Sequence, residues 1–254
     1  MSRARRRFLI EEGQLREGRA ILAGAQFHHA ANVLRLKAGD NVSLFTRSGS
    51  EYKARIEAVR SGSMILEVMS ESRPRAQGNF ELTLLQGLVR GPAMDLIVQK
   101  CAELGAARLV AVEMMRSTVR LPAKQHTGWR AKQQRWQKIA DRAAEQCGAP
   151  RPMQVTIARD LEQAVRQQEP QALVALHEEE SGAGLRQVLK RLRGARSLAL
   201  LIGPEGGLDP REVEMLDKLG AQFASLGPRI LRAETAALAA CSIVMYECGA
   251  LDTS

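Results

Sequence analysis

A glycine-rich stretch, Gly203-Pro204-Glu205-Gly206-Gly207, separates a segment typical of a strand from one typical of a helix. The apolar run Ser197 to Ile202 precedes it, and Asp209, Pro210 and Glu212 follow with the pattern of a capped helix start. Because glycine has no Cβ, the backbone of such a loop can approach a ligand closely. A plain turn is the alternative, but the length of the loop and its central Glu205 favour a ligand site. The stretch matches neither a P-loop nor G-x-G-x-x-G, so ATP hydrolysis and a conventional dinucleotide site lose support.

A second predicted strand exit carries three charged side chains. The segment Gln222 to Leu226 is followed by Gly227-Pro228-Arg229-Ile230-Leu231-Arg232 and then by an alanine-rich helix from about Glu234. The alanines alone need no function, since small side chains simply permit close packing of a neighbouring helix or a partner subunit. That reading does not explain Arg229, Arg232 and Glu234, because charges crowded at one strand exit are costly without partners.

The elements that must position these loops alternate between strand and helix after residue 79. The sequence predicts strands at 80–89, 109–112, 172–176 and 198–202, and helices at 94–104 and 129–147. This alternation indicates an α/β domain with a mostly parallel sheet covered by helices. Ligands in such folds sit beyond the carboxyl ends of the strands, and both loops leave such ends.

The first 70 or so residues show a different pattern, that of a small β-rich domain. Strands are predicted at 41–46, 51–59 and 63–69, with one helix at about Phe27 to Leu36. From residue 52 to 58, apolar and charged residues alternate with the period of two that marks a half-buried strand. The stretch Ser72 to Asn79 has turn formers and no apolar periodicity, so we place a linker there. The predicted domains are 1–73 and 79–254.

Composition narrows the class of protein further. The net charge is +9, and residues 1–75 hold 14 Lys and Arg against 8 Asp and Glu, an excess that favours a polyanionic partner over a merely soluble basic surface. Aromatic residues make up only 4%, so phosphate contacts and shape should outweigh base stacking. No apolar run approaches the roughly 18 residues of a membrane span, and no signal peptide is evident, which predicts a cytoplasmic protein.

The four cysteines show neither a C-x-x-C pair nor a histidine placed to complete a zinc set. We expect buried free thiols at Cys101, Cys147, Cys241 and Cys248, and no metal site.

Two segments, Leu201 to Gly207 and Leu226 to Thr235, resemble the paired cofactor motifs of the SPOUT methyltransferases. More narrowly they resemble the RsmE family, which methylates N3 of a uracil in 16S ribosomal RNA of the small ribosomal subunit. The likeness extends over nearly the whole chain and includes 27–40, 99–105, 116–120, 135–140 and 145–148. The chain departs from the family at Ala149, where an arginine is common, and around Ala93, where a lysine is missing, which affects single RNA contacts.

The resemblance implies an N-terminal PUA-like β-barrel, a C-terminal trefoil-knotted domain, a homodimer and S-adenosylmethionine as cofactor. By the same resemblance, the cofactor is lined by Leu176, His177, Leu201, Gly203, Pro204, Glu205, Gly206, Gly207, Leu226, Gly227, Arg229, Ile230, Leu231, Arg232 and Ala236.

Arg232 and Glu234 are the catalytic candidates. Arg232 would hold the uracil edge and stabilise charge on its carbonyl oxygen, while Glu234 would orient that arginine or relay a proton. Alternatively, Arg229 and Glu234 merely pair and set the shape of the loop. The predicted RNA contacts are Arg3, Arg5, Arg6, Arg7, Arg35, Arg116 and Arg120. For the first four, a disordered tail is the competing interpretation.

Two other functions share these features. One is a SPOUT methyltransferase acting on a different RNA, such as a transfer RNA. The other is a non-catalytic RNA-binding or ribosome-assembly protein. The glycine loop and the arginine-rich second loop favour an enzyme.

Overall fold

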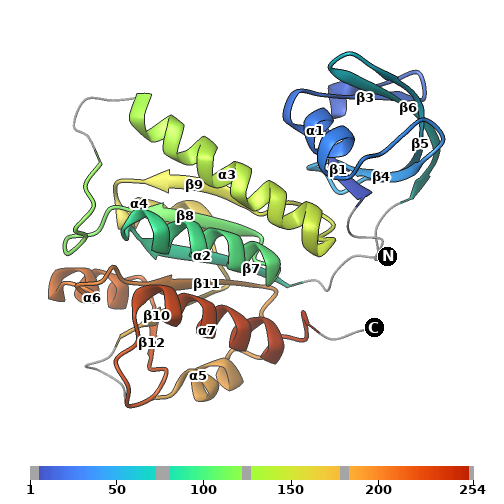
Figure 1. Ribbon diagram of the computed structural model, residues 1–254. Helices are drawn as coiled ribbons and strands as arrows, with labels where there is room; N and C mark the ends of the chain where they lie inside the picture. Colours follow the sequence, from blue (N-terminus) through green and yellow to red (C-terminus); the bar gives the residue numbers. More distant parts are fainter. Residues whose placement is uncertain (1–5, 73–79, 122–126, 178–182, 252–254) are drawn as a thin grey trace. The chain divides into compact units, whose positions relative to one another are not determined.

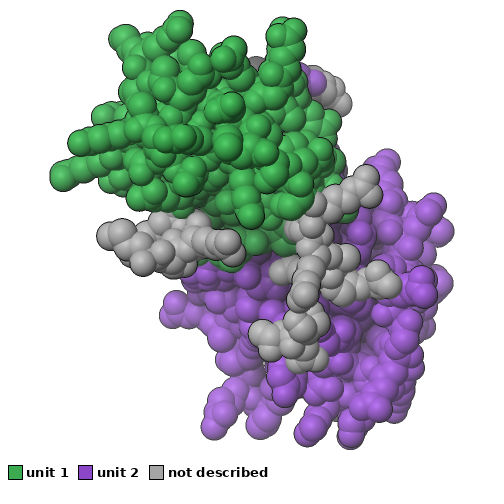
Figure 2. Space-filling view, turned by 90° about the vertical axis from the view of Figure 1, so that its right-hand side faces the viewer, with its two compact units in different colours: residues 1–76, 141–152 green, residues 77–140, 153–254 purple. Residues whose placement is uncertain are grey.

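Two compact units make up the chain in the computed structural model, which describes residues 6–72, 80–121, 127–177 and 183–251 (Figure 1). Unit 1 comprises residues 1–76 and 141–152, and unit 2 comprises residues 77–140 and 153–254 (Figure 2). Residues 141–152 therefore belong to the first unit, although they lie within the predicted second domain, 79–254. The expected linker lies almost wholly outside the described residues.

Unit 1 is built on one six-stranded sheet whose order is β1-β4-β5-β6-β3-β2. The strands are β1 (Arg7–Leu9), β2 (Leu15–Arg16), β3 (Arg19–Ala23), β4 (Asn41–Phe45), β5 (Glu51–Arg60) and β6 (Ser63–Ser72). Strand β1 runs parallel to β4, and the other neighbours are antiparallel. Along β5, Tyr52, Ala54 and Ile56 are buried while the residues between them are exposed, which confirms the alternation read from the sequence.

The helix expected at Phe27 to Leu36 begins and ends earlier. Helix α1 spans Gly24–His28 and continues into a π-helical turn, His29–Val33, labelled η3. A short 3-10 turn, η2, spans Glu12–Gln14. The start of α1 was missed because Ala23 occupies the N-cap position and its side chain makes no capping bond.

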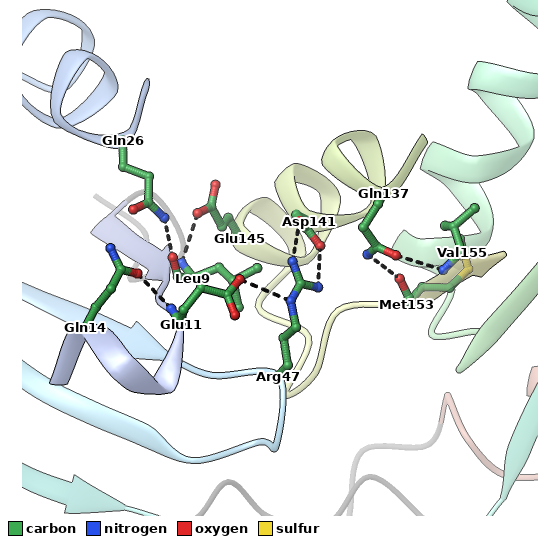
Figure 3. Close-up of polar contacts among 10 residues, drawn as sticks. All are labelled: Leu9, Glu11, Gln14, Gln26, Arg47, Gln137, Asp141, Glu145, Met153 and Val155. Carbon is green, nitrogen blue, oxygen red and sulfur yellow. Dashed lines mark hydrogen bonds and ion pairs between the residues drawn. The ribbon is translucent and has the colours of Figure 1, made fainter. Parts of the chain in front are cut away.

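The end of helix α3 (Thr127–Cys147) packs within unit 1. Asp141 accepts two hydrogen bonds from the Arg47 guanidinium, at 3.0 and 2.8 Å, and Glu145 accepts one from the backbone N–H of Leu9 at 2.9 Å (Figure 3). Earlier in the same helix, Gln137 bonds to the backbone of the strand that begins at residue 154 (Figure 3). The end of α3 is thus tied to unit 1 by its side chains.

Unit 2 contains a six-stranded, wholly parallel sheet with the order β12-β10-β11-β7-β8-β9. The strands are β7 (Glu81–Gly87), β8 (Arg108–Val112), β9 (Gln154–Ala158), β10 (Ala172–Leu176), β11 (Ser197–Ile202) and β12 (Gln222–Ala224). The predicted parallel sheet is confirmed, while β9 was not expected. Both faces are buried, as parallel sheets require: Leu84 and Leu200 are fully buried, and so are their neighbours Leu85 and Leu201.

Helices cover the sheet of unit 2. They are α2 (Gly91–Glu103), α4 (Leu161–Gln168), α5 (Leu185–Arg191), α6 (Pro210–Lys218) and α7 (Ala233–Glu247). Helix α7 packs against α2 and contacts β7 and β11, whereas α4 packs against α6 and contributes to the core that contains Leu85 and Leu201 (Figure 1). Among the described residues, no helix is long and apolar enough to span a membrane.

The cysteines depart in part from expectation. None of the four forms a disulfide, and only Cys101 and Cys241 are buried, whereas Cys147 and Cys248 are exposed near the ends of their helices. In the described ranges, no cluster of three or more potential metal ligands occurs.

Candidate active site

A cavity of about 1020 Å³ opens at the carboxyl ends of the central strands of unit 2. It is lined by residues that follow β7, β10, β11 and β12, as the parallel topology predicts. Both loops singled out in the sequence form its walls. The lining includes Leu176, His177, Gly203, Pro204, Glu205, Gly206, Gly207, Leu226, Gly227, Arg229, Ile230, Leu231, Arg232, Glu234 and Ala236.

Leu201 is the one expected cofactor residue that does not line the cavity. Its side chain is fully buried in the core shared with α4 and α6. The next residue, Ile202, lines the cavity instead. Successive side chains of a strand point to opposite faces, so the residue after Leu201 and not Leu201 itself reaches the site.

The first loop is held by the predicted helix start. Asp209 is the N-cap of α6 and accepts a hydrogen bond from the backbone N–H of Arg211 at 3.1 Å, while Glu212 accepts one from the backbone N–H of Asp209 at 2.9 Å. Within the loop, the N–H of Gly207 donates to the carbonyl of Pro204 at 2.9 Å. Gly207 has a φ of 70°, a left-handed conformation that favours glycine. The predicted capping box is confirmed. The glycine loop before it forms a tight turn.

Two glycines let neighbouring backbone segments meet at this loop. A Cβ on Gly87, at the end of β7, would lie 2.5 Å from the backbone nitrogen of Pro204. A Cβ on Gly206 would lie 3.0 Å from both the Cβ and the carbonyl oxygen of Arg116. Gly87 was not singled out in the sequence, because its contact lies far away along the chain.

Arg116 and Glu212 tie the loop after β8 to the glycine loop. The Arg116 guanidinium donates to the carbonyl of Gly206 at 3.3 Å and lies 3.7 Å from the carboxylate of Asp209. Glu212, buried at the start of α6, accepts a hydrogen bond from the backbone N–H of Met115 at 2.8 Å through its other oxygen. From the sequence, Glu212 was predicted only as a capping residue, because its bond to Met115 joins segments far apart along the chain.

Glu205 points toward the beginning of α2. Its carboxylate accepts a hydrogen bond from the backbone N–H of Arg90 at 3.2 Å, and Arg90 is the N-cap residue of α2. The carboxylate of the glycine loop therefore joins the exits of β7 and β11. Both Glu205 and Arg90 line the cavity.

The second loop, residues 225–232, is held by backbone bonds at its start. The hydroxyl of Ser225 accepts from the N–H of Gly227 at 3.0 Å, and the N–H of His177 donates to the carbonyl of Ala224 at 3.0 Å. At its end, Arg232 is the N-cap residue of α7, which starts one residue before the expected position. The second loop thus runs from β12 directly into α7.

The charges of the second loop do not pair with one another. Within the described part of the chain, Arg229, Arg232 and Glu234 make none of the ion pairs found within 4.0 Å. The alternative that Arg229 and Glu234 pair to shape the loop is therefore not what the structure shows. Both arginines are exposed on the cavity wall.

Arg7 was wrongly expected to bind RNA, because its side chain is buried. It lies 3.3 Å from Glu51, donates to the carbonyl of Ala149 at 2.6 Å, and stacks 3.6 Å above the centre of the Phe45 ring. Burial lowers the pKa of Arg7, and the Glu51 carboxylate opposes that shift. From the sequence, Arg7 was predicted to belong to a basic tail. In the structure, Arg7 is the first residue of strand β1.

The other expected RNA contacts have different surroundings. Arg6 is exposed and lies 3.2 Å from Asp40, and Arg35 is exposed as well, while Arg3 and Arg5 lie outside the described residues. Arg120 folds back onto its own loop, donating to the carbonyl of Met115 at 2.7 Å. The guanidinium of Arg120 thus helps to stabilise the loop after β8.

Comparison with known proteins identifies the chain. The family described as RNA methyltransferase domain matches residues 76–245, and the family described as RNA methyltransferase PUA domain matches residues 22–69. Fold and cavity thus define a two-domain RNA methyltransferase.

Ribosomal RNA small subunit methyltransferase E of Bacillus subtilis is 34% identical over 233 residues, which are 89% of either chain. Its Synechocystis counterpart is 30% identical over 91% of this chain and 74% of its own. The chain belongs to this family of small-subunit ribosomal RNA methyltransferases.

Two solved structures of methyltransferases are also similar to this chain. A methyltransferase from Legionella pneumophila with bound SAM has a TM-score of 0.83 and 28% identity, covering 95% of this chain and 97% of its own. Ribosomal RNA small subunit methyltransferase E from Neisseria gonorrhoeae, bound to S-adenosyl methionine, has a TM-score of 0.81 and 28% identity, covering 94% and 96%.

Proposed function

We propose that this chain transfers a methyl group from S-adenosylmethionine to N3 of a specific uracil in 16S ribosomal RNA of the small ribosomal subunit. The observation that carries the proposal is the meeting of two loops, 203–207 and 225–232, on the wall of one cavity. Two structural relatives hold this methyl donor, and the named relatives act on ribosomal RNA of the small subunit.

The cavity suits an adenosyl ligand together with a second reactant. Its volume of about 1020 Å³ lies at the upper end of the range for small-molecule sites. Leu176, Ile202 and Leu226 supply apolar surface, while the glycines between 203 and 207 expose backbone donors and acceptors. These features fit a nucleoside whose base is buried and whose sugar is hydrogen-bonded. We therefore assign the cofactor to the residues of both loops, with Leu176 and His177.

When bound, S-adenosylmethionine supplies a methyl group already activated on a sulfonium. The tasks of the chain are then to align the uracil and to help its N3 proton leave. Alignment of two bound reactants can contribute on the order of 7–11 kcal/mol, whereas a general base contributes a factor of about 10² to 10⁴. Positioning is therefore the larger contribution in this proposal.

Arg232 is the candidate for holding the uracil. Its side chain lies on the cavity wall without a carboxylate partner within 4.0 Å among the described residues, so its guanidinium is available to a carbonyl oxygen. Hydrogen bonds from a cation to an oxygen on which charge develops lower the barrier. Glu234, the second residue of α7, is the candidate for orienting Arg232 or receiving the proton.

Calorimetry with S-adenosylmethionine and turnover measurements on 16S ribosomal RNA test the proposal. We expect the pure protein to bind the donor, and Arg232→Ala to lower turnover while leaving donor affinity largely intact. Unchanged turnover would end the catalytic assignment of Arg232. Mass spectrometry of ribosomal RNA from cells lacking the gene should show the loss of one 3-methyluridine. A loss confined to transfer RNA would redirect the proposal to another substrate, and a protein that ignores the donor would support a non-catalytic role.

We further propose a cytoplasmic homodimer with a PUA-like barrel and a trefoil knot in unit 2, as the family resemblance implies. Support for the dimer comes from apolar side chains left exposed on unit 2, where Leu96 is 39%, Ile230 85% and Tyr246 66% exposed. Sedimentation velocity over a range of protein concentrations tests it, because a species of monomer mass throughout would contradict a dimer.

A further inference from the structure

The charge of the cavity is not explained by the methyl donor. Of the residues that the structure describes, four arginines and two glutamates line it: Arg90, Arg116, Arg229, Arg232, Glu205 and Glu234. S-adenosylmethionine carries a sulfonium, an ammonium and one carboxylate, so its net charge is also positive. Like charges repel, and the single carboxylate of the donor needs no more than one arginine. An excess of cationic side chains must therefore serve another ligand.

The local contacts show which cations have partners. Arg116 is engaged by Asp209 and the carbonyl of Gly206, as described above. In the ranges that the structure describes, the guanidinium groups of Arg90, Arg229 and Arg232 have no carboxylate within 4.0 Å. All three residues are exposed. Three arginines that line one cavity and have no carboxylate partner among the described residues fit an anion with several oxygens.

Arg90 is the arginine that the proposed chemistry leaves unused. Arg232 is assigned to the uracil, and Arg229 lies in the loop assigned to the donor. The main chain of Arg90 is fixed, because its N–H donates to Glu205 at 3.2 Å and it forms the N-cap of α2. Its side chain has only hydrogen-bond donors and so cannot cap the helix, and the residue is exposed. A fixed backbone with a free guanidinium suits the recognition of a phosphate at a set distance from the glycine loop.

We infer that Arg90 binds a backbone phosphate of the RNA beside the nucleotide that is methylated. The inference rests on the proposed function and adds to it a substrate-binding residue. A base that enters a cavity brings its own phosphates to the mouth of that cavity, and phosphate contacts fix the register of a nucleic acid on a protein. The hydrogen bond from the N–H of Arg90 to Glu205 joins the proposed phosphate-binding residue to the glycine loop, which we assign to the donor.

Filter binding of purified 16S ribosomal RNA over a series of KCl concentrations tests the inference, with Arg90→Ala as the main variant. Alanine keeps the N–H that bonds to Glu205, so the loop should stay in place. Arg166→Ala is the matched control: this arginine is exposed on α4, is paired with Glu162 at 2.7 Å and does not line the cavity. Both variants remove one positive charge, so a difference between them reports position and not net charge.

We expect Arg90→Ala to weaken RNA binding about tenfold and to reduce the slope of log affinity against log salt by about one unit. Arg90→Lys should recover most of the slope, because the charge remains. Equal slopes for the Arg90→Ala and Arg166→Ala variants would overturn the inference. So would weaker donor binding by Arg90→Ala in calorimetry, which would place Arg90 on the donor. Failure of the wild-type protein to bind donor would reject the proposed function separately, because the RNA slopes are measured without donor.

Discussion

Arg35 combines a left-handed backbone with an exposed cationic side chain. Its φ is 54°, and it follows Leu34, the C-cap of the helical turns, in a position where glycine is usual. This conformation costs a residue with a Cβ about 1 to 2 kcal/mol. A strained residue that keeps a long cationic side chain at the surface of a basic unit is a reasonable RNA contact.

We predict that Arg35→Gly has opposite effects on folding and on binding. The free energy of unfolding should rise by up to about 1 kcal/mol, because glycine accepts the positive φ without strain. Affinity for 16S ribosomal RNA should fall, because a cation is lost. Urea denaturation and filter binding measure the two effects, with Arg35→Lys as the variant that keeps both strain and charge. Unchanged RNA affinity would show that Arg35 is no contact.

At the scale of elements, Gly87 controls how closely β7 approaches the glycine loop. We predict that Gly87→Ala weakens S-adenosylmethionine binding by about 1–3 kcal/mol, since the new methyl group would meet backbone atoms of Pro204 and displace the loop. Calorimetry measures the loss. Gly91→Ala is the control, because a Cβ there has open space and the residue begins helix α2. Equal donor affinity in the two variants would contradict the role given to Gly87.

Glu212 accepts two backbone hydrogen bonds, one from Asp209 at the start of α6 and one from Met115 in the loop after β8. We predict that Glu212→Ala costs about 1–3 kcal/mol of unfolding free energy, because it leaves the partly buried N–H groups of Met115 and Asp209 without their acceptor. Glu214→Ala, on the same helix but in a surface pair with Lys218, should leave the urea midpoint nearly unchanged. If both variants behaved alike, the bond to Met115 would carry no stability.

What the sequence could predict depends on how local each signal is. The start of α6 was foreseen because Asp209 and Glu212 bond within three residues of each other. Strand β1, three residues long, pairs with β4 more than thirty residues away, and a run that short has no period to detect. The two loops of the site were found by their composition. Their ties to Gly87 and Arg116 are long-range packing, which a single sequence does not display.

At the scale of the whole molecule, both units carry positive charge. We propose that the basic residues of both units bind the same RNA. The first 75 residues carry a net charge of +6, and the cavity of unit 2 adds arginines without carboxylate partners among the described residues. Binding energy for RNA is therefore spread over many phosphate contacts, which makes overall affinity strongly dependent on salt. Stability, in contrast, depends on charges that are buried.

Glu145 is a partly buried charge, and it should make the stability of unit 1 depend on pH. Burial raises the pKa of this carboxyl, and the hydrogen bond from the N–H of Leu9 only partly opposes the shift. A raised pKa in the folded state means that the ionised form is destabilising, so the penalty exists at neutral pH. It disappears as the pH falls through the raised pKa toward the value of the unfolded chain.

We therefore predict that Glu145→Gln stabilises the protein at neutral pH, because the amide oxygen still accepts the Leu9 bond and no charge is buried. The gain should shrink on acidification and vanish once the wild-type carboxyl is protonated in both states. Urea denaturation at a series of pH values measures this. Glu214→Gln is a control of opposite sign, since Lys218 lowers the pKa of Glu214 and its small contribution is lost in acid. A loss of stability by Glu145→Gln at neutral pH would mean that attraction to Arg7 and Arg142 exceeds the cost of burial.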